Sequence, residues 1–231
     1  MRHALVLFSG GIDSTAALYW ARERFDRVSA LTFEYGQRHK VEVRLARRLT
    51  GAMGIPHEEI RLDLTQIGGS ALTDPAIPVP EGKDAGTTGG GPPATYVPFR
   101  NGIFLSLAAA WAEVRGPRDI VCGFHIIDSP EYPDTRTLFV DAMQKAINQG
   151  TRAAFGGDRF VLHAPFLDID KAGIIREGLK RGADFSYSIS CYAGGEVPCG
   201  RCASCLIRRR AWEEIGKEDH LLVRLRKEGR A

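Results

Sequence analysis

The sequence predicts an α/β fold, a doubly wound parallel sheet with a small C-terminal zinc-binding helical module. Short apolar runs at Ala4–Phe8 and Val28–Phe33 are typical of strands that are buried on both faces. Between them, Asp13–Arg24 carries apolar residues at helical spacing. Four cysteines cluster in the last part of the chain. Alternating strands and helices of this kind indicate a parallel sheet with right-handed crossovers.

The alternation continues to a third strand. "KVEVRLARRLTGAM" at Lys40–Met53 has the spacing of a helix, and "GIP" ends it. "EEIRLDL" at Glu58–Leu64 is predicted as the next strand, which completes a β-α-β-α-β pattern over about 65 residues. In such a sheet, the turn "SGGIDS" lies at the carboxyl end of the first strand.

A Pro- and Gly-rich segment, Thr73–Pro98, interrupts the pattern and is predicted to be a long loop. Asn101 is predicted to cap an apolar helix that Gly116 ends. The remaining predictions are strands at Arg118–His125 and Arg159–Phe166 and helices at Arg136–Asn148 and Lys171–Arg181. We expect an α/β nucleotide-binding domain over residues 1–185 and the four-cysteine module over residues 186–231.

Composition and charge are those of an ordinary globular protein. Of 231 residues, 44% are hydrophobic and 26% are charged. No apolar run approaches the roughly 20 residues that cross a bilayer. The start "MRHALVLFSGG" is predicted to be a strand, because it lacks the long apolar core and cleavage site of a signal peptide. A net charge of +3 does not by itself indicate nucleic-acid binding. We expect a cytoplasmic protein with no membrane and no direct nucleic-acid partner.

The turn "SGGIDS" (Ser9–Ser14) has the composition of a phosphate site. Backbone N–H groups of a glycine-rich turn and of the helix start that follows form a concave anion site. The turn matches neither GxxxxGK[ST] nor GxGxxG, and an ordinary turn capped by Asp13 or Ser14 fits the spacing about equally well. A carboxylate at position 13 would be repelled by phosphate unless a divalent cation lay between them. A magnesium-bound nucleotide would reconcile the two.

The clustered cysteines, within fifteen residues, have the spacing of a metal site: Cys191, Cys199, Cys202 and Cys205. In a chain without an export signal, such a cluster favours metal binding over disulfides. CxxC places two thiolates on one ion, and a fourth cysteine completes a closed tetrahedral site with a structural role. Zinc is favoured over an iron–sulfur cluster because the fourth ligand lies upstream and no CP follows the run.

Other residues near these motifs have simpler explanations. Arg201 and Arg208–Arg210 could offset the negative charge of a four-thiolate zinc site without touching nucleic acid. Cys122 lies in a predicted strand and is expected to be a small core residue. His163 is expected to be a structural residue of the last strand, and His39 is expected to be structural or peripheral.

"SGGIDS" after a first strand resembles the SGGxDS signature of the PP-loop ATP pyrophosphatases, which have the Rossmann-like adenine nucleotide hydrolase fold. Members attack ATP at its α-phosphate and release pyrophosphate. The resemblance implies ATP with magnesium at Leu7, Phe8, Ser9, Gly10, Gly11, Ile12, Asp13, Ser14, Thr15, Ala16 and Ala17. It also implies catalytic roles for Ser9, Asp13 and Ser14. "DKAG" resembles a family position at which a lysine, here Lys171, faces the phosphates.

A PP-loop domain followed by four cysteines is similar to the QueC family of 7-cyano-7-deazaguanine synthases. "FSGGIDST", "LTFEYGQRHK", "IPVP", "VPFRN", "YPDTR", "DIDKAG" and "CGRCASC" occur in the family's order. The resemblance implies an ATP-dependent carbon–nitrogen ligase that makes 7-cyano-7-deazaguanine (preQ0) for queuosine biosynthesis. Its substrates would be 7-carboxy-7-deazaguanine and ammonia. A structural zinc and a homodimer are also implied.

For the deazapurine, the residues expected to bind are Arg100, Asn101, Asp128, Tyr132 and Asp134. The arginine would pair with the substrate carboxylate, one of the two aspartates would accept from the guanine N–H edge, and the tyrosine would stack on the ring. "EYGQRH" is expected near the adenine or ribose. The chain departs from the family pattern in two places, with Phe99 where glycine is usual and with "GFHIID" around His125.

Two other functions fit part of the pattern. A PP-loop enzyme that modifies a tRNA base, such as a thiolase, would generally need a catalytic cysteine pair near the nucleotide. Outside the metal cluster the sequence has only Cys122. A zinc-containing regulator would bind nucleic acid through its basic tail, with salt-dependent affinity and no ATP chemistry. The intact "SGGIDS" disfavours the regulator, since a binding module needs no such turn.

Overall fold

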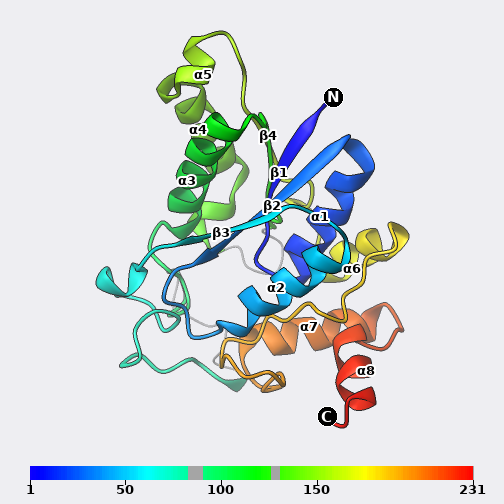
Figure 1. Ribbon diagram of the computed structural model, residues 1–231. Coiled ribbons are helices and arrows are strands. Elements are labelled where there is room, and N and C mark those ends of the chain that lie inside the picture. The colour runs from blue at the N-terminus through cyan, green and yellow to red at the C-terminus, as the bar shows by residue number, and fades with distance from the viewer. Residues whose placement is uncertain (83–90, 126–130, 231) are drawn as a thin grey trace.

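The computed structural model describes residues 1–82, 91–125 and 131–230 of the chain. In this part of the chain, five strands form one parallel sheet at the centre of the molecule, in the order β3-β2-β1-β4-β5 (Figure 1). The strands are β1 (His3–Leu7), β2 (Arg27–Glu34), β3 (His57–Arg61), β4 (Asp119–Val121) and β5 (Val161–His163). The predicted parallel sheet is confirmed.

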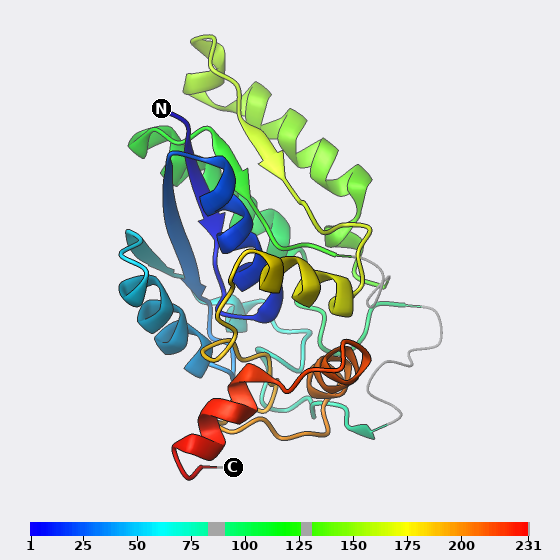
Figure 2. The ribbon, with the colours of Figure 1, turned by 90° about the vertical axis from the view of Figure 1, so that its right-hand side faces the viewer.

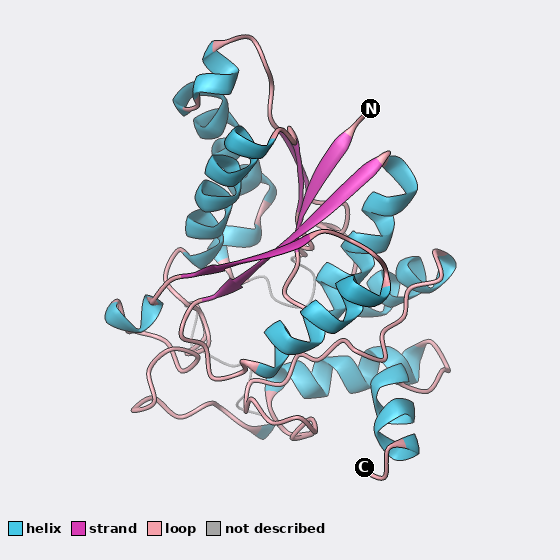
Figure 3. Cartoon of the chain, viewed as in Figure 1, coloured by secondary structure: helices cyan, strands magenta, loops and turns pink. Residues whose placement is uncertain are grey.

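Helices cover both faces of the sheet, as a doubly wound fold requires. The helices of the described chain are α1 (Ile12–Arg24), α2 (Val41–Ala52), α3 (Arg100–Arg115), α4 (Thr137–Gly150), α5 (Arg152–Phe155), α6 (Lys171–Lys180), α7 (Ala203–Glu214) and α8 (His220–Lys227). α1, α2 and α6 lie against one face, and α3 and α4 lie against the other (Figure 3). None of the described helices is long and apolar enough to span a membrane.

β1 is buried on both faces because it lies in the middle of the sheet. Ala4 and Val6 pack into the core that α1 and α6 share, whereas Leu5 packs into the core beneath α3 and α4. Side chains alternate between the faces along a strand, so a central parallel strand needs apolar residues at every position. This explains the uninterrupted apolar run that predicted the strand.

The strand order places a topological switch point beside β1. From β1 the chain builds outward through β2 to β3, and it then returns to the other side of β1 for β4 and β5. Connections that leave the carboxyl ends of β1 and β4 therefore diverge to opposite faces of the sheet and leave a crevice between them. The glycine turn, which follows β1, lies at this edge as predicted.

Three strands are shorter than their predicted spans. β3 ends at Arg61, and Asp63 then accepts a hydrogen bond from the Thr65 N–H at 3.0 Å to begin the 3₁₀ turn Leu64–Gln66. β4 and β5 contain only three residues each, because β4 pairs with β1 only over Ala4–Val6 and β5 pairs with β4 only over Asp119–Val121. Of the residues that follow these three strands, Cys122 and Phe124 after β4 line the cavity described below, whereas Leu64 and Phe166 pack into the hydrophobic cores.

The prediction that Asn101 caps a helix is wrong. α3 begins at Arg100, and the preceding Phe99 has a left-handed backbone with a φ of 51°. The cap comes from another segment, because Asp134 Oδ2 accepts from the Asn101 N–H at 3.0 Å. A partner 33 residues away leaves no trace in the local sequence pattern. The predicted end of the helix, at Gly116, is confirmed.

The C-terminal segment lies beneath the carboxyl ends of the strands, with α7 beside α6 (Figure 2). Ala211 and Trp212 of α7 join the hydrophobic cluster that contains Ile174 of α6 and Phe185. The division of the chain at residue 185 stays a prediction. The hydrophobic core, however, continues across that position.

Candidate functional site

A cavity of about 290 Å³ opens at the switch point. Its wall contains the glycine turn after β1, the segment after β4 and the start of α6. The segment between β2 and α2, the start of α3 and residues beside the cysteine cluster complete it. Segments that are far apart in the sequence therefore meet in one site, at the edge where doubly wound sheets bind ligands.

The glycine turn is held by hydrogen bonds among its own residues. Ser9 Oγ lies 3.1 Å from Ser14 Oγ, and the Ser14 hydroxyl also donates to the Gly11 carbonyl at 3.2 Å. The N-cap residue of α1 is Gly11, which makes no side-chain cap hydrogen bond, so neither Asp13 nor Ser14 is the N-cap residue of this helix. The helix start therefore keeps the amide donors that an anion can use.

Two glycines allow backbone segments to approach the turn closely. Gly10 has a φ of +83°, and a Cβ atom there would lie 2.9 Å from the Glu42 carbonyl oxygen. A Cβ atom on Gly123, just after β4, would lie 2.7 Å from the carbonyl carbon of Asp13. Sequence analysis identified the first of these glycines and missed the second. Its signal is a glycine directly after a buried strand, where a close approach is common.

Asp13, His125 and Lys171 form a charged cluster from the segments that follow β1, β4 and β5. Lys171 Nζ donates to Asp13 Oδ1 at 2.5 Å and to Oδ2 at 2.7 Å, and it lies 3.0 Å from His125 Nε2. Burial acts to raise the pKa of Asp13, but the charges of Lys171 and His125 outweigh it and the pKa is lowered. The carboxylate is therefore ionised at neutral pH.

A second polar group in the wall consists of Tyr35, His39, Glu42 and Arg100. Arg100 Nη1 donates to the Tyr35 hydroxyl at 3.1 Å, and Glu42 Oε2 lies 3.5 Å from His39 Nε2. Burial, with help from Arg100, lowers the pKa of His39 to about 4, so the ring is neutral at pH 7. Burial raises the pKa of Glu42 well above its ordinary value. Buried polar groups such as His39 and Glu42 are costly without hydrogen-bond partners, and a polar ligand in the cavity could supply such partners.

Three of the five residues expected to bind the deazapurine line the cavity. Arg100, Asn101 and Tyr132 line the cavity, and the Tyr132 hydroxyl lies 2.7 Å from Thr95 Oγ1. Asp134 is buried but is not part of the cavity wall, and its Oδ2 is used at the start of α3. Asp128 lies outside the described residues. The cavity therefore gives no support to Asp134 as a substrate contact.

Glu42 was not predicted as a site residue, and His125 was noted only as a departure from the family pattern. The signal for the first is an acidic residue between Val41 and Val43 in the first turn of an amphipathic helix. The expectation that "EYGQRH" lies at the site agrees with the positions of Tyr35, Gln37 and His39 in the cavity wall, although no nucleotide contact tests it.

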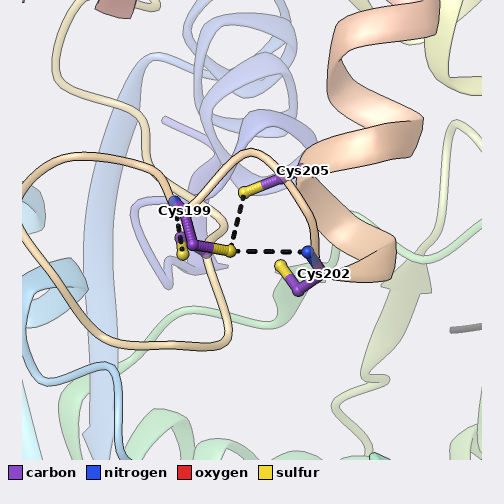
Figure 4. A group of neighbouring side chains, drawn as sticks. Cys199, Cys202 and Cys205 are labelled. Atoms are coloured by element: carbon purple, nitrogen blue, oxygen red, sulfur yellow. Dashed lines mark hydrogen bonds between the residues drawn. The ribbon is translucent and has the colours of Figure 1, made fainter. Parts of the chain in front are cut away.

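The four cysteine sulfurs lie within 4.8 Å of one another, as predicted for a metal site. Figure 4 shows Cys199, Cys202 and Cys205 facing a common centre, with Cys199 Sγ 3.9 Å from Cys205 Sγ. Tetrahedral zinc thiolates require sulfur separations of about 3.8 Å. The Cys199 N–H points at Cys191 Sγ at 3.3 Å, and hydrogen bonds from the neighbouring thiols lower the pKa of Cys191. The four sulfur donors and their separations fit one zinc ion.

The basic residues near the cysteines are mostly paired with carboxylates. Arg208 is buried, and it binds Asp219 through Nε at 2.5 Å and through Nη2 at 2.7 Å. Arg201 lies 3.0 Å from Glu81. The guanidinium of Arg208 is engaged in a buried ion pair between α7 and the start of α8, and its expected role in offsetting a metal charge stays a prediction.

Two residues expected to be structural have structural environments. His163 Nε2 lies 2.7 Å from Asp119 Oδ1, which joins β5 to β4. Cys122 is fully buried, its Sγ donates to the His163 carbonyl at 3.4 Å, and burial raises the pKa of its thiol. Its side chain also borders the cavity. A thiol of raised pKa is a poor nucleophile, which disfavours a catalytic cysteine at this position.

Comparisons with known proteins identify the family of the chain. A family model described as queuosine biosynthesis protein QueC matches residues 3–216. A 7-cyano-7-deazaguanine synthase of Methylococcus capsulatus is 43% identical over 222 residues, 95% of this chain and 97% of that protein. One from Cupriavidus necator is 46% identical over 222 residues, 94% and 96% of the two chains. A solved structure, a predicted subunit of a tRNA methyltransferase from Methanocaldococcus jannaschii, shares the fold with a TM-score of 0.51. It is 14% identical and covers 95% of this chain and 91% of that chain.

Proposed function

Since the chain belongs to the QueC family of queuosine biosynthesis proteins, we propose that its cavity converts 7-carboxy-7-deazaguanine and ammonia into 7-cyano-7-deazaguanine with ATP. The enzyme is an ATP-dependent ligase of queuosine biosynthesis. The observation that carries the assignment to this cavity is the meeting of the glycine turn, Asp13 and Lys171 at the switch point. We place the enzyme in the cytoplasm, as a homodimer without a nucleic-acid partner, as part of the same proposal.

The chemistry explains why ATP is needed. A carboxylate is a poor acyl donor because its leaving group would be oxide. Transfer of AMP to the carboxylate releases pyrophosphate and forms a mixed anhydride. Ammonia then forms the C–N bond while AMP leaves with the electrons of the C–O bond, and the nitrogen loses a proton. The resulting amide needs a second activation of its oxygen before it can become a nitrile. The protein's part is to position the reactants and to balance their charge.

We assign the phosphates of ATP to the glycine turn, within the segment Leu7–Ala17. The uncapped start of α1 supplies amide donors, and Ser9 and Ser14 supply hydroxyl groups. Lys171 supplies positive charge from the start of α6. An ionised carboxylate at Asp13 is the hard oxygen ligand that magnesium prefers, so the residues fit a magnesium-bound nucleotide. Magnesium, when bound, would neutralise charge on the phosphates.

We assign the deazapurine to the part of the cavity that Arg100, Asn101 and Tyr132 line. Arg100 is half-buried beside Tyr35 in the cavity wall, and its guanidinium can pair with the substrate carboxylate through two parallel hydrogen bonds. Tyr132 can stack on the bicyclic ring. This arrangement presents the carboxylate to the nucleotide, which the reaction requires.

We assign the four cysteines to a structural zinc ion. Four thiolates leave no open position for a substrate, so the metal takes no part in the reaction. Its effect on the site is indirect, because the Ile189 N–H donates to the Gly10 carbonyl at 3.1 Å, two residues before Cys191. Zinc would in this way support the glycine turn.

The test is to incubate the purified protein with ATP, magnesium, ammonium and 7-carboxy-7-deazaguanine and to follow the product by mass spectrometry. We expect the nitrile without added tRNA, which separates this function from tRNA modification. Asp13→Ala and Ser14→Ala should abolish turnover and keep their zinc content, which excludes misfolding. A protein that forms neither amide nor nitrile would contradict the proposal.

A further inference from the structure

Two carboxyl groups line the described part of the cavity, those of Asp13 and Glu42. Lys171 donates to both oxygens of Asp13, so that carboxylate is already engaged beside the glycine turn. Glu42 lies in the first turn of α2, and its Oε2 is 3.5 Å from His39 Nε2, which is longer than an ordinary hydrogen bond. Its carboxyl therefore keeps acceptor capacity toward the cavity.

The residues around Glu42 could bind a planar aromatic ligand that carries a negative charge at one side. Phe104, Tyr132 and Tyr192 line the same cavity and offer aromatic faces and edges. Arg100 lies close enough to influence the charge of Glu42. A carboxyl and a guanidinium in one aromatic cavity complement a ring with N–H donors at one edge and a carboxylate elsewhere.

Resting on the proposed function, we propose that Glu42 is the specificity-determining residue that accepts hydrogen bonds from the N1–H and 2-amino groups of the deazaguanine ring. The two oxygens of a carboxylate match two adjacent N–H donors. Asp134, the alternative acceptor, holds the Asn101 N–H at the start of α3 and is not part of the cavity wall.

Recognition of the base would explain why the carboxyl group of Glu42 lies in the wall of the cavity. A buried carboxyl without good donors is unfavourable, and burial raises the pKa of Glu42 accordingly. A ligand with both N–H groups would satisfy the carboxyl, whereas a ligand without the 2-amino group would leave one acceptor position unpaired. Sites of this kind reject the analogue that lacks a hydrogen-bond partner.

The experiment measures binding by isothermal titration calorimetry, with 7-carboxy-7-deazaguanine and with 7-carboxy-7-deazahypoxanthine, which lacks the 2-amino group. We expect the wild-type protein to bind the deazaguanine about tenfold to a hundredfold more tightly. In Glu42→Gln this preference should fall to within about twofold, mostly through weaker binding of the deazaguanine. Glu34→Gln is the matched control, because Glu34 lies at the end of β2, pairs with Lys40 and is not part of the cavity wall.

Each outcome decides the matter. Equal wild-type affinity for the two ligands overturns the role of Glu42 even if the variant does not fold. If Glu42→Gln weakens the binding of both ligands equally, the effect is structural and the inference is overturned. A variant that loses affinity for a non-hydrolysable ATP analogue and keeps the base preference places Glu42 at the ribose and overturns the inference. A wild-type protein that binds neither deazapurine contradicts the proposed function itself.

Discussion

The ring of Phe99 occupies the space beside Gly102 that any larger side chain would need. A Cβ atom on Gly102 would lie 2.3 Å from Phe99 Cε1. Phe99 has a left-handed backbone, and its ring also contacts Phe139 edge-on. A non-glycine residue in that conformation is strained. The two positions therefore depend on each other, because the ring of Phe99 fits only where the residue three positions later is glycine.

We predict that Gly102→Ala lowers the free energy of unfolding by about 1–3 kcal/mol, because the added methyl group overlaps the Phe99 ring. Phe99→Gly removes that overlap, so Phe99→Gly with Gly102→Ala should be more stable than Gly102→Ala alone. Urea denaturation of the two single variants and the double variant measures the coupling. Additive effects would contradict this dependence.

Lys171 is expected to be essential for activity. Lys171→Met removes the cation that faces the glycine turn and leaves the carboxylate of Asp13 without that partner. We predict a fall of about a hundredfold or more in kcat, as for other groups that stabilise developing charge. Lys180→Met, at the exposed end of the same helix, should keep wild-type rates. A steady-state assay of nitrile formation compares the two, and similar rates would rule out a role at the phosphates.

His39 should make stability depend on pH in the acid range. The unfolded chain protonates this residue near its ordinary pKa of 6.5, whereas the folded protein does so only near about 4. Between these values the unfolded state binds more protons, so stability rises with pH and falls as acid is added. We predict a loss of about 1.4 kcal/mol per pH unit from this residue below pH 6.5. His39→Gln should lose stability less steeply, which denaturant titrations at pH 5 and pH 7 would detect.

Arg208 should matter for stability rather than for nucleic-acid binding. Arg208→Met leaves the buried carboxylate of Asp219 without its partner and is expected to lower the free energy of unfolding by about 3–5 kcal/mol. Arg209→Ala, which removes an exposed arginine 3.9 Å from Glu213, should cost less than about 1 kcal/mol. Thermal unfolding measures both effects. Equal destabilisation by Arg208→Met and Arg209→Ala would show that the buried ion pair of Arg208 contributes no more to stability than an exposed one.

Removal of the metal should weaken nucleotide binding. Cys199→Ser opens the four-sulfur site, and we expect it to lose zinc, measured by plasma mass spectrometry, and to lower the unfolding temperature. Affinity for a non-hydrolysable ATP analogue should fall as well, because the segment that holds Gly10 loses its anchor. Cys122→Ala should keep the full metal content. Unchanged nucleotide affinity in a zinc-free variant would contradict the link.

The sequence predicted the features that local patterns encode. The apolar run Ala4–Phe8, the glycine turn and the cysteine spacing each depend on residues that are close together in the chain, and each prediction agrees with the structure. The start of α6 at Lys171 agrees as well, because Asp170 caps the helix by accepting from the Gly173 N–H.

The remaining features depend on contacts between distant segments. The Asn101 cap was wrong because Asp134, from a separate turn, supplies the acceptor. The buried ion pair of Arg208 was not predicted, because its partner Asp219 lies eleven residues later in the chain. Glu42 was overlooked because a glutamate in the first turn of a helix is ordinarily exposed. In each case the partner, rather than the residue itself, decides the role.

The hydrogen bond from Ile189 to Gly10 also bears on the order in which the protein is completed during translation. The glycine turn is synthesised among the first residues, but its support arrives with the cysteine segment, nearly a whole chain later. A chain that ended before residue 189 would contain all five strands of the sheet, but its glycine turn would still lack this hydrogen bond.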